Sequence, residues 1–305
     1  MVIRTFAQLD MAMVERPPLR PAVAGADDPA TLTALANALA AGRIAGAVLA
    51  GDAEAIKRLL PEQLVGKVVI RRARDATEAA ALSVAAIRAG EADVLVKGSV
   101  DSAAYLRAVV SRETGLRASE VLSNITLAEM PSVPRLIGAT DNGILVLPTL
   151  DQKRAILRNA VPLFAGLSVS PLRVAAIAAS EKVHPSQPAT TDAAALRDEW
   201  AMGGGSVLVD GPFGYDVALS PAAAAKKGFA ASPVAGQADL ILFPSIEAGN
   251  ATVKAWKLHG QARTASIVMG ARVPVLLNSR ADGTEQRRLG LLLAAAVLAG
   301  QGAIQ

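Results

Sequence analysis

The chain has 305 residues, a length that favours two domains over a single core. Apolar residues make up 52% and charged residues 19%, which excludes a disordered chain and indicates a large core. The net charge is only +4. With no cysteine and two histidines, disulfides, thiolate metal sites and thiol nucleophiles are excluded, and histidine-rich metal sites and Ser-His-Asp triads are poor candidates.

Short runs of Val, Ile, Leu and Ala recur along the chain, separated by alanine-rich segments of helical length. Continuous apolar runs, instead of alternating ones, are typical of strands buried on both faces of a parallel sheet. Helical segments between such strands indicate an α/β fold. In chain order the predicted strands are 46–50, 68–70, 94–96, 144–147, 174–177, 207–209, 240–243, 266–269 and 273–277.

The ends of the chain predict no membrane insertion. Residues 1–20 contain no apolar signal core, and the apolar stretch 289–300 is shorter than the roughly 20 residues of a spanning helix. Aromatic residues make up 3%, and no concentrated basic face with stacking platforms is evident. We therefore expect a cytoplasmic protein that binds neither membrane nor nucleic acid.

Polar and glycine residues follow the predicted strands, at the carboxyl ends where open α/β sheets bind ligands. Lys97-Gly98-Ser99 is one such segment, between a predicted strand and a helical stretch. It fits a turn that holds a phosphate or an acyl oxygen at a helix N-terminus. It fits equally a plain turn in which Ser99 or Ser102 caps the helix.

Two later segments offer more hydrogen-bonding groups. Glu247, Gly249 and Asn250 follow the strand that ends at 243 and are suited to shaping a ligand site, or they begin a helix capped by Ser245. The segment 279–282 reads Ser-Arg-Ala-Asp after the last predicted strand. The arginine of this segment could bind a phosphate through two hydrogen bonds, and the serine could donate a hydrogen bond to a developing oxyanion. The segment also fits the capped start of a helix with an ion pair on the surface.

Other segments favour structural roles. The basic cluster 71–74 fits either a solvated loop or an anion pocket. The glycines 203–205 precede a strand, whereas phosphate-binding glycine loops follow one, so a Rossmann dehydrogenase or a P-loop NTPase is not expected. We interpret His184 and His259 as structural or surface residues. A break between domains is expected near 137–143.

Taken in order, these segments resemble the phosphate acyltransferases, the family of phosphate acetyltransferases and phosphate butyryltransferases, and the butyryltransferase branch most. The resemblance is widest over 140–289. It rests on 97–99, 115–117, 150–153, 180–183, 191–196, 209–212, 232–239, 246–250 and 279–282. The chain departs from the family pattern at Leu145, Thr149, Val217 and Ser245, where relatives carry Asn, Asp, Asn and Asp.

The resemblance implies two α/β domains with a cleft between them, as in isocitrate and isopropylmalate dehydrogenases, and a homodimer. We expect residues 1–140 with 282–305 to form the first domain and 141–281 the second. The implied reaction moves a short acyl group (acetyl, butyryl or similar) between coenzyme A and inorganic phosphate by direct transfer in a ternary complex. The partners are then acyl-CoA, phosphate and acyl phosphate, with no metal and no tightly bound cofactor.

The resemblance also implies roles for individual residues. Ser279 would donate to the carbonyl oxygen or the thiol, Arg280 would bind phosphate, and Asp282 is the leading base candidate with Glu285 second. Because a thiol of pKa about 8.5 is only a few per cent ionised at pH 7, a carboxylate base would help. The residues expected to bind substrate are Lys97, Gly98, Ser99, Arg117, Asp210, Gly211, Glu247, Gly249 and Asn250.

Two other functions are weighed beside this one. A non-catalytic module that binds CoA or acyl phosphate and regulates a partner would fit the departures from the family pattern. A dehydrogenase of the same fold would need clustered aspartates for a divalent metal and a nicotinamide pocket, and the sequence contains no such set.

Overall fold

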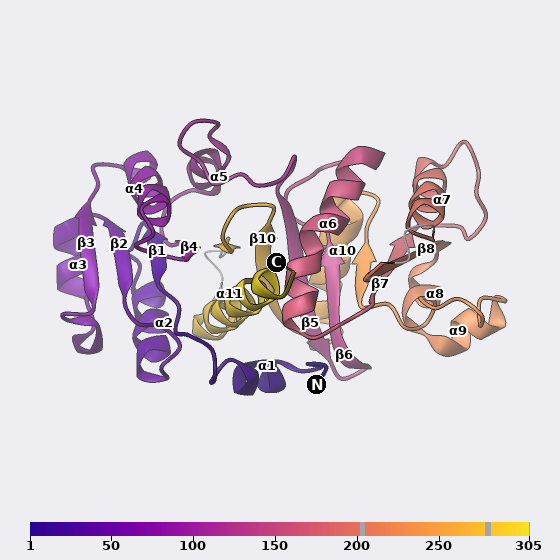
Figure 1. The fold of residues 1–305 in the computed structure, drawn as a ribbon, viewed down its shortest axis with the longest axis horizontal. Coiled ribbons are helices and arrows are strands. Elements are labelled where there is room, and N and C mark those ends of the chain that lie inside the picture. Colours follow the sequence, from indigo (N-terminus) through magenta and orange to yellow (C-terminus); the bar gives the residue numbers. More distant parts are fainter. Residues whose placement is uncertain (202–204, 278–281, 305) are drawn as a thin grey trace. The chain divides into compact units, whose positions relative to one another are not determined.

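A computed structural model describes residues 1–201, 205–277 and 282–304 and shows helices alternating with mostly parallel strands (Figure 1). The expected α/β fold is therefore present. The chain divides into two compact units, which we describe separately. The N-terminal unit comprises Ala7–Glu120 and Ala265–Leu298. The central unit comprises Met1–Phe6, Val121–Thr264 and Ala299–Gln305.

The boundaries of these units differ from the expected division at 140/141 and 281/282. The first boundary lies at 120/121 and the second at 264/265. Strand β6 (Val133–Thr140) explains the first difference, because it pairs with β5 (Ser123–Met130) on one side and with β9 (Leu240–Leu242) on the other. A cut at 140 would separate β6 from β9, its hydrogen-bonded neighbour.

The sheet of the N-terminal unit follows the order β3-β2-β1-β4-β11-β10. Its first four strands are parallel, β11 is parallel to β4, and β10 is antiparallel to β11. Every residue of β1, β2 and β4 is buried, as the apolar runs predicted for β2 and β4. The strands are β1 (Pro21–Ala24), β2 (Ala47–Gly51), β3 (Val68–Arg72), β4 (Val94–Lys97), β10 (Arg263–Met269) and β11 (Val275–Leu276).

The helices of this unit mostly begin at an aspartate cap. Asp28, Asp52 and Asp75 each accept hydrogen bonds from backbone N–H groups in the first turn of the helix that follows. The helices are α1 (Phe6–Ala12), α2 (Pro29–Ala40), α3 (Ala53–Leu59), η1 (Glu62–Leu64), α4 (Ala76–Arg88), α5 (Ser102–Val110) and α11 (Thr284–Ile304), the last running on into the central unit.

The sheet of the central unit follows the order β5-β6-β9-β7-β8, with β5 antiparallel to β6 and the remaining pairs parallel. The remaining elements are β7 (Leu172–Ile177), β8 (Val207–Phe213), α6 (Leu150–Gly166), α7 (Pro188–Ala201), α8 (Tyr215–Leu219), α9 (Pro221–Lys226) and α10 (Ile246–Leu258).

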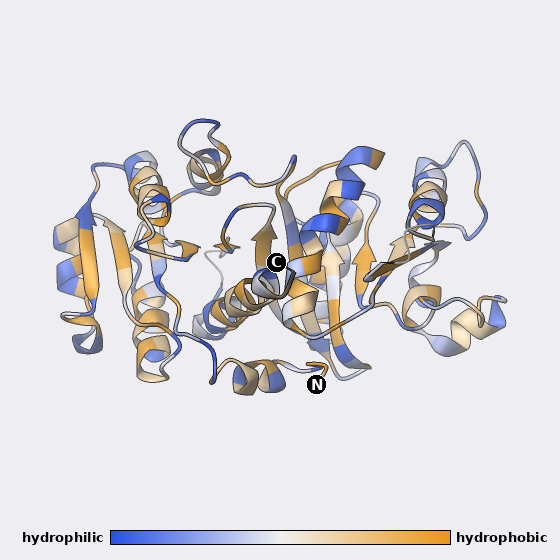
Figure 2. Ribbon diagram, in the orientation of Figure 1, coloured by the Kyte–Doolittle hydropathy of each residue, from blue (hydrophilic) through white to orange (hydrophobic). Residues whose placement is uncertain are grey.

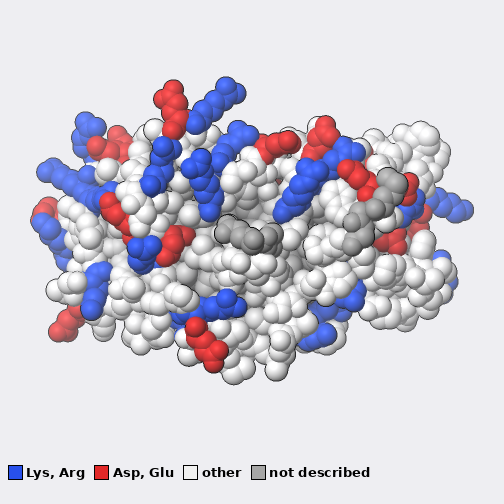
Figure 3. All heavy atoms as spheres, in the orientation of Figure 1, with Lys and Arg blue, Asp and Glu red and all other residues white. Residues whose placement is uncertain are grey.

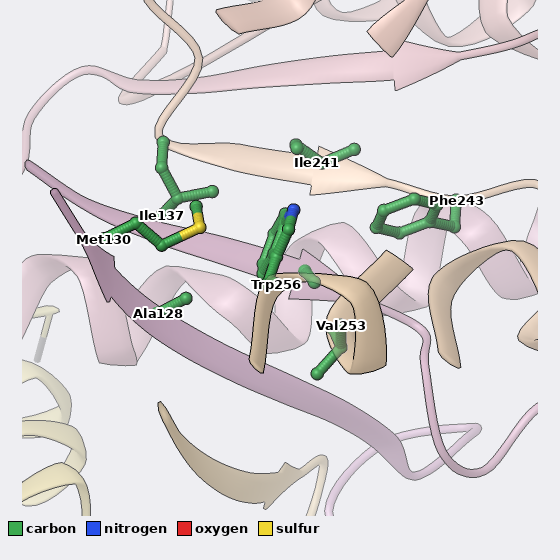
Figure 4. Close-up of a cluster of buried hydrophobic side chains, with 8 residues drawn as sticks. Ala128, Met130, Ile137, Ile241, Phe243, Val253 and Trp256 are labelled. Carbon is green, nitrogen blue, oxygen red and sulfur yellow. The ribbon is translucent and has the colours of Figure 1, made fainter. Parts of the chain in front are cut away.

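Helix α10 is held against this sheet by an apolar cluster. Val253 and Trp256 pack with Met130, Ile137 and Ile241 of the neighbouring strands, and each of these side chains is buried (Figure 4). Truncating a buried tryptophan in such a cluster costs about 3–5 kcal/mol. The cluster therefore fixes the position of the first turn of α10, which carries three of the expected substrate-binding residues.

The strand prediction was wrong in two respects. Residues 144–147 form no strand, and Val146 and Leu147 are exposed there, directly after a turn at the end of β6. Strands β1, β5 and β6 were not predicted. The reason is that β5 contains Ser123, Asn124 and Glu129 among its apolar residues, so it lacks the continuous apolar run.

The distribution of charged side chains on the surface agrees with the modest net charge of the chain. The strands are largely hydrophobic and polar residues gather on the helices and loops (Figure 2). Basic and acidic side chains are interspersed on the face drawn in Figure 3. Within the described ranges, no helix combines the length and the hydrophobicity needed to cross a membrane.

Candidate functional site

The segment Lys97-Gly98-Ser99 forms a tight turn at the carboxyl end of β4 in the N-terminal unit. A Cβ atom on Gly98 would lie 2.0 Å from the backbone oxygen of Gly25, so only glycine fits there. The N–H of Ser99 donates to the same oxygen at 2.8 Å, and its hydroxyl donates to Asp27 Oδ1 at 2.7 Å. The turns that follow β1 and β4 are thus locked together.

The helix cap after this turn is a different residue from the one expected. Asp101 caps α5 by accepting from the N–H of Ala104 at 2.8 Å, and this hydrogen bond lowers the pKa of its carboxyl. The prediction that Ser99 or Ser102 caps this helix was wrong. Lys97 is 3% exposed and its Nζ donates to the backbone oxygen of Gly98 at 3.3 Å, so the turn contains a buried cation.

Arg117 lies in a loop of the same unit, beside the connection from β10 to β11. Its backbone forms an isolated antiparallel bridge with Ala271. Its guanidinium donates to the backbone oxygens of Glu120 at 2.6 Å and Ser119 at 3.4 Å. The side chain is exposed, and it is held by the carbonyl groups of its own loop.

Two of the residues expected to carry the chemistry, Asp282 and Glu285, lie at the start of α11. Ser279 and Arg280 lie outside the described residues. Asp282 is half-buried, two residues before the helix, and Glu285 lies in its first turn. Arg288 binds Glu285 through two hydrogen bonds of 2.8 and 3.1 Å. This bidentate pair raises the pKa of the Arg288 guanidinium.

Arg287, which sequence reasoning missed, connects α11 to the start of α2. It is 6% exposed, and its Nη2 lies 3.1 Å from Asp28 Oδ2 while its Nη1 donates to Thr31 Oγ1 at 2.7 Å. The signal available in the sequence was an arginine two residues before the apolar run Leu289–Gly300. Its partner lies more than 250 residues away, which no local pattern reveals.

Glu247, Gly249 and Asn250 lie on the first turns of α10 in the central unit. Ser245 is the cap, accepting from the N–H of Ala248 at 3.5 Å, so the alternative of a capped helix start is confirmed. A Cβ atom on Gly249 would lie 2.7 Å from the backbone oxygen of Asp141. The amide of Asn250 donates to the backbone oxygen of Asn142 at 3.2 Å, whereas Glu247 is exposed.

A buried polar network supports this helix start, and sequence reasoning missed it. Asn124 donates to Asn142 Oδ1 at 2.8 Å, and Asn142 donates to Thr126 Oγ1 at 2.9 Å. Asn124, Thr126, Asp141 and Asn142 are all at most 6% exposed. The expected break between domains at 137–143 is therefore the end of β6 and the turn that follows it.

Asp141 is the centre of that turn. Its carboxylate accepts four backbone N–H groups, from Gly143 and Ile144 at 2.7 and 2.9 Å and from Asn124 and Leu145 at 3.1 and 3.3 Å. Burial raises the pKa of the carboxyl, and the four hydrogen bonds act in the opposite direction. The arrangement fixes the backbone on which Gly249 and Asn250 rest.

Asp210 and Gly211 lie within β8 rather than after it, because this strand continues to Phe213. The carboxylate of Asp210 accepts from the N–H of Gly211 at 2.7 Å and from the hydroxyl of Ser232 at 2.5 Å. Arg197 donates to the backbone oxygen of Gly211 at 3.2 Å. These contacts give both residues a structural role in joining β8 to α7 and to the turn at 232–235.

Other segments of the family pattern make contacts within the central unit. Lys153 of α6, 5% exposed, pairs with Asp192 of α7 at 2.7 Å. Lys227 pairs with Glu181 at 2.8 Å and with Asp216 at 3.1 Å. The two ion pairs of Lys227 lower the pKa of the Glu181 and Asp216 carboxyls and raise the pKa of Lys227 itself. Much of the pattern therefore maintains the unit's architecture.

The remaining sequence features have structural explanations. Arg71 pairs with Glu91 and Arg74 with Glu78, which argues against an anion pocket at the basic cluster. The predicted loop was wrong for Arg71 and Arg72, which end strand β3. His184 and His259 are exposed. Among residues 1–201, 205–277 and 282–304, no three His, Asp or Glu side chains are grouped as metal ligands would be.

Known proteins that are similar to this chain are described as phosphate acyltransferases. The chain is 38% identical over 248 residues to a probable phosphate butyryltransferase of Bacillus subtilis (strain 168), covering 81% of this chain and 83% of the relative. It is 35% identical over 277 residues to a phosphate acetyltransferase of Thermotoga maritima, covering 90% and 93%. A branched-chain phosphotransacylase from Enterococcus faecalis V583 shares its fold with a TM-score of 0.82 and 25% identity, over 92% of this chain and 99% of the other.

The family model for phosphate acetyl/butaryl transferases matches residues 53–295, well over half of the chain and a span that includes every candidate site residue named above. The chain belongs to the phosphate acetyl/butaryl transferase family of enzymes.

Proposed function

We propose that the protein transfers a short acyl group between coenzyme A and inorganic phosphate. The observation that carries this proposal is the family match over residues 53–295. The relatives described above are acetyl, butyryl and branched-chain enzymes, so the proposed acyl chain has two to five carbons.

The proposed chemistry needs no nucleophile on the protein. In one direction phosphate attacks the thioester, and in the other the CoA thiolate attacks the acyl phosphate. Arg280 would hold the phosphate and Ser279 would donate to the developing oxyanion, interactions worth about 2–4 kcal/mol each in the transition state. The strand that precedes these residues in the sequence, β11, runs parallel to β4, and its carboxyl end lies at the edge of the sheet where α/β proteins bind ligands.

Asp282 is the first of the two proposed bases and Glu285 the second, as the resemblance to the family implies. Glu285 accepts two hydrogen bonds from Arg288, which also binds Asp10 at 2.9 Å. We expect Asp282→Asn to lower kcat more than Glu285→Gln does.

The remaining assignments extend the proposal to binding. Lys97 and Ser99 would contact the phosphate or the acyl oxygen. Asn250, in the central unit, would bind the substrate. A cleft between two domains, the homodimer and the cytoplasmic location stay predictions. Asp210 and Gly211 are the weakest of the proposed binding residues, since their polar groups bond to neighbours.

The experiment is CoA release from a panel of acyl-CoAs, from acetyl to branched five-carbon chains, followed by thiol titration with and without phosphate. We expect release that requires phosphate. Arg280→Ala should lower kcat/KM by about 100-fold or more, whereas Arg58→Ala, at an exposed position of α3, should leave it unchanged. Binding of acyl-CoA with no turnover across the panel would contradict the proposal and support a non-catalytic module.

A further inference from the structure

A small pocket lies in the N-terminal unit, between α1, the end of α2 and the middle of α11. Its volume is about 110 Å³. One wall consists of apolar side chains that are each at most 5% exposed, those of Met13, Leu19, Ala38, Leu291 and Leu292. An apolar cavity of about 150 Å³ holds a ligand of the size of benzene, so this pocket can hold a chain of about four or five carbons.

The pocket lies at the opposite ends of the strands from the candidate residues of the same unit. Leu19 and Arg43, which line it, come shortly before β1 and β2, and the backbone of Leu19 forms an isolated parallel bridge with Ile44. They therefore lie at the amino ends of two parallel strands. Lys97-Gly98-Ser99 follows the carboxyl end of β4, which runs parallel to β1 and lies at the edge where α/β sheets ordinarily bind ligands. The pocket is therefore not an extension of that region.

The mouth of the pocket is open to solvent. Its lining includes four exposed residues, Arg16, Pro17, Asn37 and Ala41, beside the buried apolar wall. A closed void left by imperfect packing would be lined by buried residues alone. A small molecule from solution can therefore enter this pocket and reach the apolar wall.

Two arginines of the lining are held in place by carboxylates. Asp10 Oδ1 accepts from Nε and Nη2 of Arg43 at 3.1 and 2.8 Å, and its Oδ2 accepts from Nη1 of Arg288 at 2.9 Å. Arg288 also donates to Glu285 at 2.8 and 3.1 Å. The side chain of Arg43 is 20% exposed and those of Asp10 and Arg288 are 35% exposed. Arg43 and Arg288 therefore form a fixed, partly buried rim whose charges are already paired.

Arg16, the third arginine of the lining, has donors available for a ligand. Its side chain makes no hydrogen bond and no ion pair with residues 1–201, 205–277 or 282–304, and its neighbour Glu15 does not line the pocket. The two oxygens of a carboxylate match the fork of donors on a guanidinium. A cation would be disfavoured, because three arginines and a single carboxylate, that of Asp10, line the pocket.

We propose that this pocket binds a short aliphatic monocarboxylate, at a site separate from the one where the acyl transfer is proposed to occur. The hydrocarbon chain lies against the apolar wall, where its burial is favourable, and the carboxylate binds Arg16 at the mouth. The inference does not depend on the proposed function, since none of the residues assigned to the reaction lines the pocket.

The test is titration with butyrate at pH 7 and constant ionic strength, followed through the carbon-13 methyl signals of the methionines. Met13 lines the pocket, whereas Met130 and Met269 are buried elsewhere, and Met13→Leu identifies the Met13 signal. We expect the Met13 signal alone among these three to shift and saturate, with a Kd of about 1–10 mM for so small a ligand. Butanol should bind about threefold or more weakly than butyrate, and butylamine should leave the signal unchanged.

Two variants locate the bound ligand. Ala295→Leu adds bulk at a lining position of α11 and should abolish the shift, whereas Ala40→Leu, at an exposed position of α2 outside the lining, should keep it. Arg16→Gln should weaken butyrate binding about threefold or more and leave butanol binding unchanged. Its matched control is Arg58→Gln, at an exposed position outside the pocket, which should change neither.

The Met130 and Met269 signals report whether a variant keeps its fold. If Ala295→Leu disturbs them, Arg16→Gln, at an exposed position, still decides the question. The proposal is overturned if butyrate up to about 50 mM produces no saturable shift of Met13 or if butylamine binds as tightly as butyrate. It is equally overturned if a folded Ala295→Leu protein or the Arg16→Gln protein binds butyrate as the wild type does.

Discussion

Two strand-to-helix turns, one in each unit, show how the same local pattern produces different sites. The turn from β4 to α5 and the turn from β9 to α10 each place a serine and a tightly packed glycine close to the start of a helix. In the first turn Asp101 caps the helix, and the Ser99 hydroxyl binds Asp27 in a neighbouring turn. In the second, Ser245 is itself the cap.

The difference lies in what supports each glycine. Gly98 packs against the backbone of Gly25, on a neighbouring strand-to-helix turn of the same sheet. Gly249 packs against Asp141, in a turn fixed by a buried carboxylate and two asparagines. The N-terminal turn therefore depends on close backbone packing, and the central turn depends on buried hydrogen bonds. A serine near a helix start is consequently not evidence of either a cap or a ligand contact until its neighbours are known.

The largest expected effect comes from filling the space at the two glycines. Gly98→Ala places a methyl group 2.0 Å from a backbone oxygen and should lower the free energy of unfolding by about 3 kcal/mol or more. Gly249→Ala meets a backbone oxygen at 2.7 Å, but it gains helix propensity of about 1 kcal/mol, so its loss should be about 1–2 kcal/mol.

The matched control is Gly302→Ala, near the end of α11, where an added Cβ meets no atom within 4 Å. It should leave stability unchanged or raise it by up to about 1 kcal/mol. Urea unfolding of the three variants measures these differences. Equal losses at Gly98 and Gly249 would remove the distinction between the two turns.

The next largest expected effect is a difference between the alanine variants of Ser245 and Ser99. Ser245→Ala removes a helix cap and should lower the free energy of unfolding by about 1 kcal/mol with little change in kcat/KM. Ser99→Ala removes no cap, so we expect a smaller change in stability and a loss of kcat/KM of about tenfold if the hydroxyl contacts substrate. Thermal unfolding and the CoA-release assay together measure both. A Ser99 variant with full activity would assign that hydroxyl to Asp27 alone.

The smallest effect is a difference in pH dependence between the two aspartates. The pKa of Asp101 is lowered by its hydrogen bond to Ala104, so its contribution to stability is present above the ordinary aspartate pKa of about 3.9 and is lost as the pH falls through the folded value. The pKa of Asp141 is raised by burial. Its contribution is present below about pH 3.9 and is lost as the pH rises through the folded value.

Unfolding free energies of the wild type, Asp101→Asn and Asp141→Asn between pH 3 and 7 check these signs. As the pH rises, the wild type should gain stability relative to Asp101→Asn and lose it relative to Asp141→Asn. Slopes of the same sign for both variants would show that burial does not dominate at Asp141.

Three of the four departures from the family pattern, Thr149, Ser245 and Val217, have a structural explanation. Thr149 caps α6 in a reciprocal arrangement with Gln152, and Ser245 caps α10. Asp, Ser and Thr are all good helix caps, which explains how the chain can carry Thr and Ser where relatives carry Asp. Val217 is fully buried beside Phe213, so an apolar residue fits there. The structure offers no comparable explanation for Leu145.

The sequence by itself determined the α/β class, the family and the positions of the residues expected in the reaction. These features are local, because apolar runs, helix lengths and motif spacing depend on residues close in the chain. The tertiary structure decided which polar groups are already bonded and which charges gather. Asp141 lies beside α10, Arg287 reaches Asp28, and Arg43 lines one pocket with Arg288. The chain separations are about 100 to 260 residues, and only long-range packing creates such contacts.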